Sequence, residues 1–327
     1  MTEPIRWGIL GTGNIAHQFA RGLADTADAT LAAVGSRSAA TADAFGDEFG
    51  IPRRHATYQD LASDDAIDAV YVSTPHPYHK DNSILLLEHG KAVLCEKPFT
   101  INAGEAKVVI DVARQRDVFL MEAMWTRYVP AVVRARKLIN EGAIGDVRMV
   151  QADFGFRAGV NPEGRLFNPS LGGGALLDVG IYVSSFASMV LGPKPSEVVS
   201  TTQIGETGVD EQSAMLLKYP GGEIAVLSCA VRTGTAVEAR IFGTDGSITF
   251  HSPFFKCDAI TVKRGGDEER IELPLQGNGY NYEAAEVGRC LRADLRESDV
   301  MPLDETLALM ELLDSIRAQW GLTYPME

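Results

Sequence analysis

The most constraining feature of the sequence is a glycine-rich turn between an apolar run and a helical pattern. Residues 5–10 (IRWGIL) are mostly apolar, the turn follows at residues 11–16 (GTGNIA), and apolar residues then recur at helical spacing. The turn matches G-x-G-x-x-G/A, where the first glycine permits a tight turn and the second lets the backbone approach a pyrophosphate. The helix N-terminus adds free N–H groups. We therefore expect a dinucleotide diphosphate to bind at Gly11, Thr12, Gly13, Asn14 and Ile15.

Strand-like and helical segments alternate along the first 122 residues. Strands are expected at 5–10, 30–35, 68–73, 92–95 and 118–121, with helical patterns after residue 13 and at 39–49, 77–89 and 103–116. Alternation of this length is typical of βαβ units and a parallel sheet. We predict a Rossmann-type, doubly wound α/β domain over residues 1–122.

The pattern changes after residue 122. Consecutive strands separated by short turns are expected at 147–156, 197–203, 213–219, 223–231, 236–244 and 247–251. Such an order favours an antiparallel sheet. Helical patterns occur at 175–191, 281–295 and 304–318. We predict an α+β domain over residues 123–327 with a large, mostly antiparallel open sheet, whose C-terminal helix 304–318 packs back on the first domain.

The end of the second strand bears on the choice of cofactor. Sites selective for NAD place Asp or Glu about 20 residues after the glycines, where it accepts from the ribose 2′-hydroxyl. No acidic residue lies between Asp28 and Asp43, and the strand ends at Ser36 and Arg37. A guanidinium can pair with a 2′-phosphate and a serine can donate to it. The sequence favours NADP, with NAD as the alternative; the other interpretation of Arg37, which we favour less, is an ordinary solvated residue after a strand.

Polar residues follow two further strands of the predicted parallel sheet. Thr74-Pro75-His76 follows one strand, with His79 at the start of a helix, and Glu96-Lys97-Pro98 follows the next. Ligands bind at the carboxyl ends of strands in open α/β sheets. We predict that these residues contact the cofactor, with His76 near the nicotinamide. A lysine there can also hold a substrate hydroxyl and lower the pKa of a nearby acid/base group.

A second set of candidate residues lies in the apolar helical segment of the second domain. Three glycines at 172–174 precede Asp178 and Tyr182, which are four residues apart and so share a helical face. A tyrosine has an ordinary pKa of about 10 and needs a nearby cation to act near neutrality. Lys97 would supply that charge in the predicted mechanism. Taken alone, a buried and hydrogen-bonded structural tyrosine is the alternative for Tyr182.

The composition excludes several classes of partner. The chain has 327 residues and a net charge of −14, so it would repel nucleic acids and anionic membranes. Four cysteines without C-x-x-C or metal-ligand spacing argue against a disulfide framework and against a metal site. Neither an N-terminal targeting pattern nor an uninterrupted run of about 20 apolar residues is present. We expect a cytosolic protein with a small-molecule substrate.

Several motifs together resemble a known family. GILGTGNIA, VSTPHPYH, CEKPF and GGGALLDVGIY occur in the order and spacing of the glucose–fructose oxidoreductase/inositol dehydrogenase/MocA-like family, and the resemblance spans essentially the whole chain. MEAMWTRY (121–128) and RLFNPSLG (165–172) resemble the dimeric dihydrodiol dehydrogenase and NADP-dependent D-xylose dehydrogenase branch.

This resemblance implies roles for individual residues. Lys97 would be the catalytic lysine, followed by a cis peptide bond to Pro98. Many members have histidine where this sequence has Tyr182, which departs from the inositol dehydrogenase pattern and makes tyrosine the acid/base, with Asp178 beside it. The sheet of the second domain would form a homodimer interface. The substrate-binding residues would be Trp125, Arg127, Phe154, Asp178 and Tyr182.

The sequence therefore predicts an enzyme that transfers a hydride between a nicotinamide and a hydroxyl-bearing or carbonyl carbon of a sugar, sugar derivative or trans-diol. Two alternatives remain at this point. One is a glycoside hydrolase that redox-cycles a tightly held NAD, and the other is a non-catalytic dinucleotide sensor. The identity of the sugar or diol is not encoded in any of these motifs.

Overall fold

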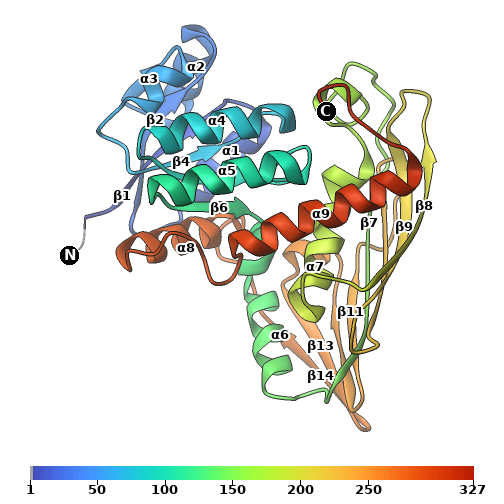
Figure 1. Ribbon diagram of the computed structural model, residues 1–327. Helices are drawn as coiled ribbons and strands as arrows, with labels where there is room; N and C mark the ends of the chain where they lie inside the picture. The colour runs from blue at the N-terminus through green and yellow to red at the C-terminus, as the bar shows by residue number, and fades with distance from the viewer. Residues whose placement is uncertain (1–2) are drawn as a thin grey trace. The chain divides into compact units, whose positions relative to one another are not determined.

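The computed structural model describes residues 3–327, which divide into two compact units (Figure 1). The first unit comprises residues 1–125 together with 276–307, and the second comprises 126–275 together with 308–327. The sequence analysis assigned 123–327 to one continuous second domain. Residues 276–307 instead belong to the first unit, because the helix they contain packs on the N-terminal segments.

The first unit is built on a six-stranded parallel sheet in the order β3-β2-β1-β4-β5-β6. This is the strand order of the dinucleotide-binding doubly wound fold, so the predicted Rossmann architecture is confirmed. Strands β4 and β5 are buried along their whole length, as expected for the centre of a parallel sheet. The strands are β1 (Ile5–Leu10), β2 (Ala29–Gly35), β3 (Arg53–His55), β4 (Ala69–Val72), β5 (Ala92–Glu96) and β6 (Leu120–Ala123).

Helices cover this sheet, and side-chain caps mark where several of them begin. Ser38 caps the backbone N–H of Thr41, and Asn102 caps that of Glu105, so two helices start where the sequence places a short polar residue. The helices are α1 (Asn14–Leu23), α2 (Ala39–Phe49), α3 (Tyr58–Ala62), α4 (His79–Glu88), α5 (Ala103–Arg116) and α8 (Tyr280–Arg292). The short α3 and strand β3 were not predicted, because each has only a few residues.

The second unit contains an eight-stranded sheet in the order β14-β13-β12-β11-β7-β10-β9-β8. All neighbours are antiparallel except β7 and β10, which confirms the predicted mostly antiparallel sheet. The strands are β7 (Val147–Gly155), β8 (Glu197–Ile204), β9 (Asp210–Lys218), β10 (Ile224–Ala230), β11 (Ala239–Gly243), β12 (Gly246–Phe250), β13 (Ala259–Arg264) and β14 (Asp267–Glu272).

Parts of this unit differ from what the sequence predicts. Helix α6 (Pro130–Asn140) and the hairpin of β13 and β14 are not among the predicted elements. The hairpin turns at Gly265-Gly266, where Arg264 pairs with Asp267, so a two-residue glycine turn was present in the sequence. Strand β14 is largely charged and exposed, which hides the alternation of a strand. The segment 236–238, assigned to a strand, is not in one, and β11 begins at Ala239.

The helix that carries the candidate acid/base residue lies in the core of the second unit. A π-helical turn over Leu176–Gly180 leads into α7 (Ile181–Leu191), which contacts β7 and β10. The stretch Pro169–Leu191 is long and apolar enough to cross a membrane by composition alone, but 83% of its most apolar window is buried in the protein. Its apolar character is therefore that of a core helix.

The last helix, α9 (Leu303–Trp320), begins in the first unit and continues in the second. In the second unit, Gln319 accepts a hydrogen bond from Ser200 N at 3.0 Å and donates to Val198 O at 3.1 Å. These contacts pair part of the otherwise open edge of β8, which limits its availability for strand addition. Each unit thus has its own sheet. The predicted cofactor-binding residues lie in the first unit, and Asp178 and Tyr182 lie in the second.

Candidate functional site

The glycine-rich turn has the backbone geometry that diphosphate binding requires. Gly11 has a φ of 105°, and a Cβ there would lie 2.9 Å from Ser73 Oγ, so only glycine fits. A Cβ on Gly13 would meet no atom within 4 Å. Gly13 is the N-cap residue of α1 and provides no side-chain cap, which leaves the first N–H groups of the helix available to an anion. Open space and free donors together fit a pyrophosphate.

Ser36 and Arg37 follow β2, where the sequence predicts contact with the ribose 2′-substituent. Ser36 is buried, and its hydroxyl contacts Thr41 Oγ1 at 2.6 Å and Thr12 Oγ1 at 3.4 Å. These contacts fix the serine between the glycine-rich turn and the start of α2. Arg37 is exposed and, among residues 3–327, forms no hydrogen bond or ion pair with the protein. An unpaired guanidinium beside an ordered hydroxyl suits a phosphate dianion.

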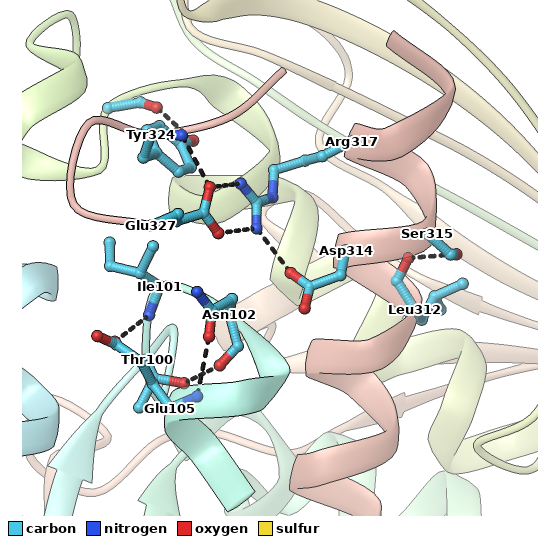
Figure 2. A network of polar contacts seen from close by, with 11 residues as sticks. Thr100, Ile101, Asn102, Glu105, Leu312, Asp314, Ser315, Arg317, Tyr324 and Glu327 are labelled. Atoms are coloured by element: carbon cyan, nitrogen blue, oxygen red, sulfur yellow. Dashed lines mark hydrogen bonds and ion pairs between the residues drawn. The ribbon is translucent and has the colours of Figure 1, made fainter. Parts of the chain in front are cut away.

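The segment after β5 is held in a defined conformation. The Lys97–Pro98 peptide bond is cis, as the family resemblance implied. Glu96 Oε2 accepts a hydrogen bond of 3.0 Å from the backbone N–H of Lys97. The chain then enters α5 through a capping box, in which Asn102 Oδ1 accepts from Glu105 N and Glu105 Oε2 accepts from Ile101 N (Figure 2). Lys97 therefore projects from a short, well-anchored connection.

His79 serves a different purpose from the one predicted. Both of its ring nitrogens contact backbone carbonyl oxygens, Nδ1 with Pro98 O at 3.0 Å and Nε2 with Thr74 O at 2.7 Å. Burial lowers its pKa, so the ring is neutral and donates only one of these two hydrogen bonds. The ring braces the ends of two neighbouring strands and presents no nitrogen to a cofactor. His76 packs edge-on against it, with ring centroids 5.7 Å apart, and Pro75 begins that turn.

A buried carboxyl group lies beside Glu96, and the sequence analysis did not single it out. Glu283 in α8 has no exposed surface, and neither of its oxygens has a hydrogen-bond partner among the described residues. Burial, and then the charge of Glu96, raise the pKa of Glu283 well above its usual value. Tyr71 donates a short hydrogen bond to Glu96, and the pKa of this phenol is raised as well, mainly by burial. Burial and the neighbouring charge thus both favour the protonated form of Glu283.

Trp125 is at the end of the first unit and packs against α8. Its ring stacks on Tyr280, with centroids 4.7 Å apart and an interplanar angle of 13°. A Cβ on Gly279 would lie 2.6 Å from the indole, so this glycine permits the close approach. The predicted substrate residue is therefore a buried aromatic ring, 4% exposed, with one face already covered.

In the second unit, Asp178 lies within the π-helical turn. Its side chain is almost completely buried, and Oδ1 accepts a hydrogen bond of 2.7 Å from Arg165. The guanidinium of Arg165 is about half exposed, so it approaches the carboxylate from the solvent side. Turns with i→i+5 hydrogen bonds are rare in helices and frequent at functional sites. Sequence periodicity does not distinguish them from α-helix, and this turn was predicted as ordinary helix.

Tyr182 lies in a cluster of aromatic rings. Its ring centroid is 5.3 Å from that of Phe154 and 5.7 Å from that of Phe255, and those two phenylalanines stack on each other at 4.5 Å. The rings come from α7, β7 and the turn after β12, so three segments fix the orientation of the phenol. Phe154 and Tyr182 were predicted together, whereas Phe255 was not.

Arg127 is buried in the second unit and is bound to α7. Its Nε donates to Ser185 Oγ at 3.0 Å, and its Nη2 donates to Ser185 O at 3.0 Å. The side chain is only 2% exposed. These contacts make Arg127 a bridge between the segment after Trp125 and the helix of Tyr182, which differs from the predicted contact with substrate.

Comparison with known proteins matches both halves of the chain. Residues 5–124 match the model of an oxidoreductase family with an NAD-binding Rossmann fold, and residues 132–249 match that of the GFO/IDH/MocA C-terminal domain. The chain belongs to the GFO/IDH/MocA oxidoreductase family. The predicted family and enzyme class are thereby confirmed, and the protein is an oxidoreductase that binds a nicotinamide dinucleotide in its first unit.

Several relatives cover the full length of the chain. It is 36% identical to trans-1,2-dihydrobenzene-1,2-diol dehydrogenase of Mus musculus and 38% identical to that of Danio rerio, with 99% of each chain covered. Solved structures include a 3-ketoreductase from Actinomadura kijaniata in complex with NADP and TDP-benzene (25% identity, 97% and 98% coverage, TM-score 0.86). Another is aldose-aldose oxidoreductase from Caulobacter crescentus (25% identity, 98% coverage of each chain, TM-score 0.88).

Proposed function

We propose that the protein is an NADP-dependent dehydrogenase or reductase that acts on a sugar, a sugar derivative or a trans-diol. Tyr182 carries this proposal, because its phenol is held by aromatic rings on the same helical stretch as the Arg165-bound Asp178. The relatives support the substrate class, since their names describe a diol dehydrogenase, a 3-ketoreductase and an aldose-aldose oxidoreductase.

Each polar residue has a defined part in the proposed reaction. Tyr182 exchanges a proton with the substrate oxygen, and Lys97 supplies the positive charge that favours the phenolate. Asp178, which Arg165 orients through a hydrogen bond of 2.7 Å, accepts a hydrogen bond from a substrate hydroxyl. When bound, the nicotinamide accepts or supplies the hydride. Phe154 and Phe255 exclude water from the phenol.

The proposed preference for NADP depends on Arg37 and Ser36. The guanidinium of Arg37 has no acidic partner within the described chain and would pair with the 2′-phosphate, to which Ser36 donates. Among the structural relatives, the Actinomadura kijaniata enzyme is a complex with NADP.

The decisive experiment compares turnover by Tyr182→Phe and Lys97→Met variants with a matched control. Activity is measured with NADP⁺ on the trans-dihydrodiol of benzene and on a panel of aldoses, and with NADPH on the corresponding carbonyls. Both variants should lose at least about 100-fold in kcat. Tyr282→Phe is the control, because its phenol oxygen only accepts a hydrogen bond from Gln276 N in the first unit. Near wild-type turnover in both variants would overturn the mechanism.

We also propose a homodimer formed through the open face of the second unit's sheet. Side chains alternate along the strands, so that Met215 and Leu217 are buried while Leu216 is 49% exposed. Leu216 is paired across the sheet with Val199 on one side and Val226 on the other, and both are exposed. A row of exposed apolar residues across three strands is typical of an interaction surface.

A cytoplasmic location is proposed on the state of the cysteines. All four are buried and free, and burial raises the pKa of each thiol. Free thiols are typical of reducing compartments. Fractionation of cells expressing the tagged full chain tests this directly, and recovery outside the cytoplasmic fraction would contradict it.

A further inference from the structure

Three consecutive glycines, residues 172–174, form a loop before Asp178, here called the triglycine loop. A side chain from the last segment of the chain holds this loop. Tyr324 donates a hydrogen bond of 2.7 Å from its phenol to the carbonyl oxygen of Gly173. Two of the three glycines have positive φ, 68° at Gly172 and 121° at Gly174. Such a loop has few side-chain contacts of its own, so its position depends on hydrogen bonds to its backbone.

A second buried side chain holds the other end of this loop. Asp210, at the start of β9, has no exposed surface, and its Oδ2 accepts a hydrogen bond of 2.7 Å from Leu176 N. Oδ1 of the same carboxyl lies 2.1 Å from the position that a Cβ on Gly174 would occupy. The carboxyl thus packs directly against the loop and binds the first N–H of the π-helical turn.

Tyr324 is itself held by an extensive ionic network, which Figure 2 shows. Arg317 donates to both oxygens of Glu327 at 2.8 Å, and Glu327 also accepts from Tyr324 N at 2.7 Å. A further hydrogen bond of 2.7 Å joins Arg317 to Asp314. The guanidinium carbon lies 4.9 Å from the centroid of the Tyr324 ring, and Arg317 is only 3% exposed. Separating the buried guanidinium of Arg317 from its two carboxylate partners would leave an unpaired buried charge, which is costly. The network therefore holds Tyr324 in place.

We propose that Tyr324 and Asp210 are positioning residues for the acid/base helix, acting from opposite ends of the triglycine loop. The loop leads directly into the turn that carries Asp178, and Tyr182 follows within the next turn of helix. A shift of about 1 Å in reacting groups can reduce a rate about 100-fold. The inference rests on the proposed function of Tyr182, and it assigns a positioning role to the last segment of the chain.

The experiment compares two variants that each lose one side-chain hydroxyl, at Tyr324 and at Ser315. Tyr324→Phe deletes the hydrogen bond to Gly173 but keeps the ring over Arg317. Ser315→Ala is the matched control, because Ser315 only donates to Leu312 O within α9 (Figure 2). We expect Tyr324→Phe to lower kcat about 10-fold while leaving the Kd for NADP⁺ unchanged, whereas Ser315→Ala should retain both.

Amide hydrogen exchange gives a readout that does not depend on turnover. In Tyr324→Phe, exchange should accelerate in peptides covering residues 172–182 and remain unchanged in β13 and β14. Asp210→Leu, which has no acceptor for the backbone N–H of Leu176, should accelerate exchange in the same peptides, so it tests the proposal even if one variant fails to fold. Wild-type exchange and wild-type kcat in both variants would overturn the proposal.

The proposal and the proposed function fail in different ways. If Tyr182→Phe is inactive but Tyr324→Phe behaves like Ser315→Ala in both assays, the positioning role is wrong and the acid/base assignment stands. If Tyr182→Phe is fully active while exchange still accelerates in Tyr324→Phe, the loop is held as described but the helix does not carry the acid/base group.

Discussion

Asp210 accepts a hydrogen bond of 2.7 Å from the backbone N–H of Leu176 while its other carboxyl oxygen is buried without a partner among residues 3–327. Burial raises the pKa of Asp210 to about 7, against a usual value of 3.8. Two neighbouring groups lower the pKa of this carboxyl, the hydroxyl of Ser213 and the charge of Arg317. The charge of Asp210 in turn raises the pKa of Cys229 and of Tyr324. A group that caps the turn of Asp178 thus titrates near neutral pH.

The raised pKa of Asp210 predicts how stability depends on pH. Between pH 4 and 7 the folded protein retains a proton that the unfolded chain has lost, so the free energy of unfolding falls as the pH rises through this range. Each unit of pKa difference corresponds to about 1.4 kcal/mol. Asp210→Asn should remove this contribution. Urea unfolding at pH 5 and pH 8 is the measurement, and the stability of the variant relative to wild type should increase with pH. If the difference in the free energy of unfolding between variant and wild type is the same at both pH values, the raised pKa of Asp210 is contradicted.

Glu283 is predicted to be protonated at pH 7. The charge of Glu96 raises the pKa of this carboxyl and no cation lowers it, so ionisation would place a second negative charge in a buried site. In an Asp210→Asn background, which removes the other carboxyl that holds a proton near neutral pH, infrared spectroscopy should detect the C=O stretch of a protonated carboxyl, and Glu283→Gln should remove it. Glu105→Gln is the control, since Glu105 is paired with Lys80 at 3.1 Å. Loss of the band in the control, or its persistence in Glu283→Gln, would refute the prediction.

Arg37 is predicted to determine the choice of cofactor. Charge-assisted hydrogen bonds contribute about 1.5–3 kcal/mol, so Arg37→Ala should raise the Kd for NADP⁺ by roughly 10- to 100-fold. The Kd for NAD⁺ should change less than about twofold, because NAD⁺ lacks the 2′-phosphate. Arg21→Ala provides the control, as this arginine is paired with Glu48 on the surface. Titration calorimetry with both cofactors gives the constants, and equal losses for the two cofactors would exclude the proposed role.

Arg165 is predicted to affect catalysis more than stability. The side chain is about half exposed, and exposed ion pairs contribute at most about 1 kcal/mol to folding. Its hydrogen bond nevertheless fixes the orientation of Asp178, so Arg165→Met should lower kcat/KM for the sugar or diol about 10-fold. The melting temperature should fall by only a few degrees, and the Kd for NADP⁺ should not change. A large loss of stability with unchanged kcat/KM would show that the pair is structural.

Features that depend on neighbouring residues in the sequence could be predicted, whereas contacts between residues far apart in the sequence could not. The glycine-rich turn, the parallel sheet and the cis bond before Pro98 depend on local sequence or on motifs, and all were predicted. The environment of Glu283 was not, because α8 lies almost 200 residues beyond Glu96 in the chain and nothing local marks the contact. The same holds for Tyr324, whose partner Gly173 is a backbone carbonyl and leaves no trace in side-chain patterns.

Predicted ligand-binding residues that also contact protein atoms show a second limit. His79 and Arg127 carry donors typical of binding sites, yet both spend them on protein atoms, His79 on the carbonyls after two strands and Arg127 on Ser185. Buried polar groups need such partners, so a histidine or arginine in a motif can be conserved by folding alone. Only coordinates distinguish this use from ligand binding.

Leu216 tests the proposed dimer. It lies at the centre of the exposed row that Val199 and Val226 complete, so Leu216→Lys places a charge where a partner sheet would desolvate it. The variant should elute as a monomer of about half the wild-type mass in size-exclusion chromatography with light scattering. Val133→Lys introduces the same change at a side chain that is 50% exposed on α6, and it should leave the mass unchanged. If Leu216→Lys keeps the wild-type mass, the dimer interface lies elsewhere. If the wild-type protein is itself a monomer, the dimer proposal is wrong.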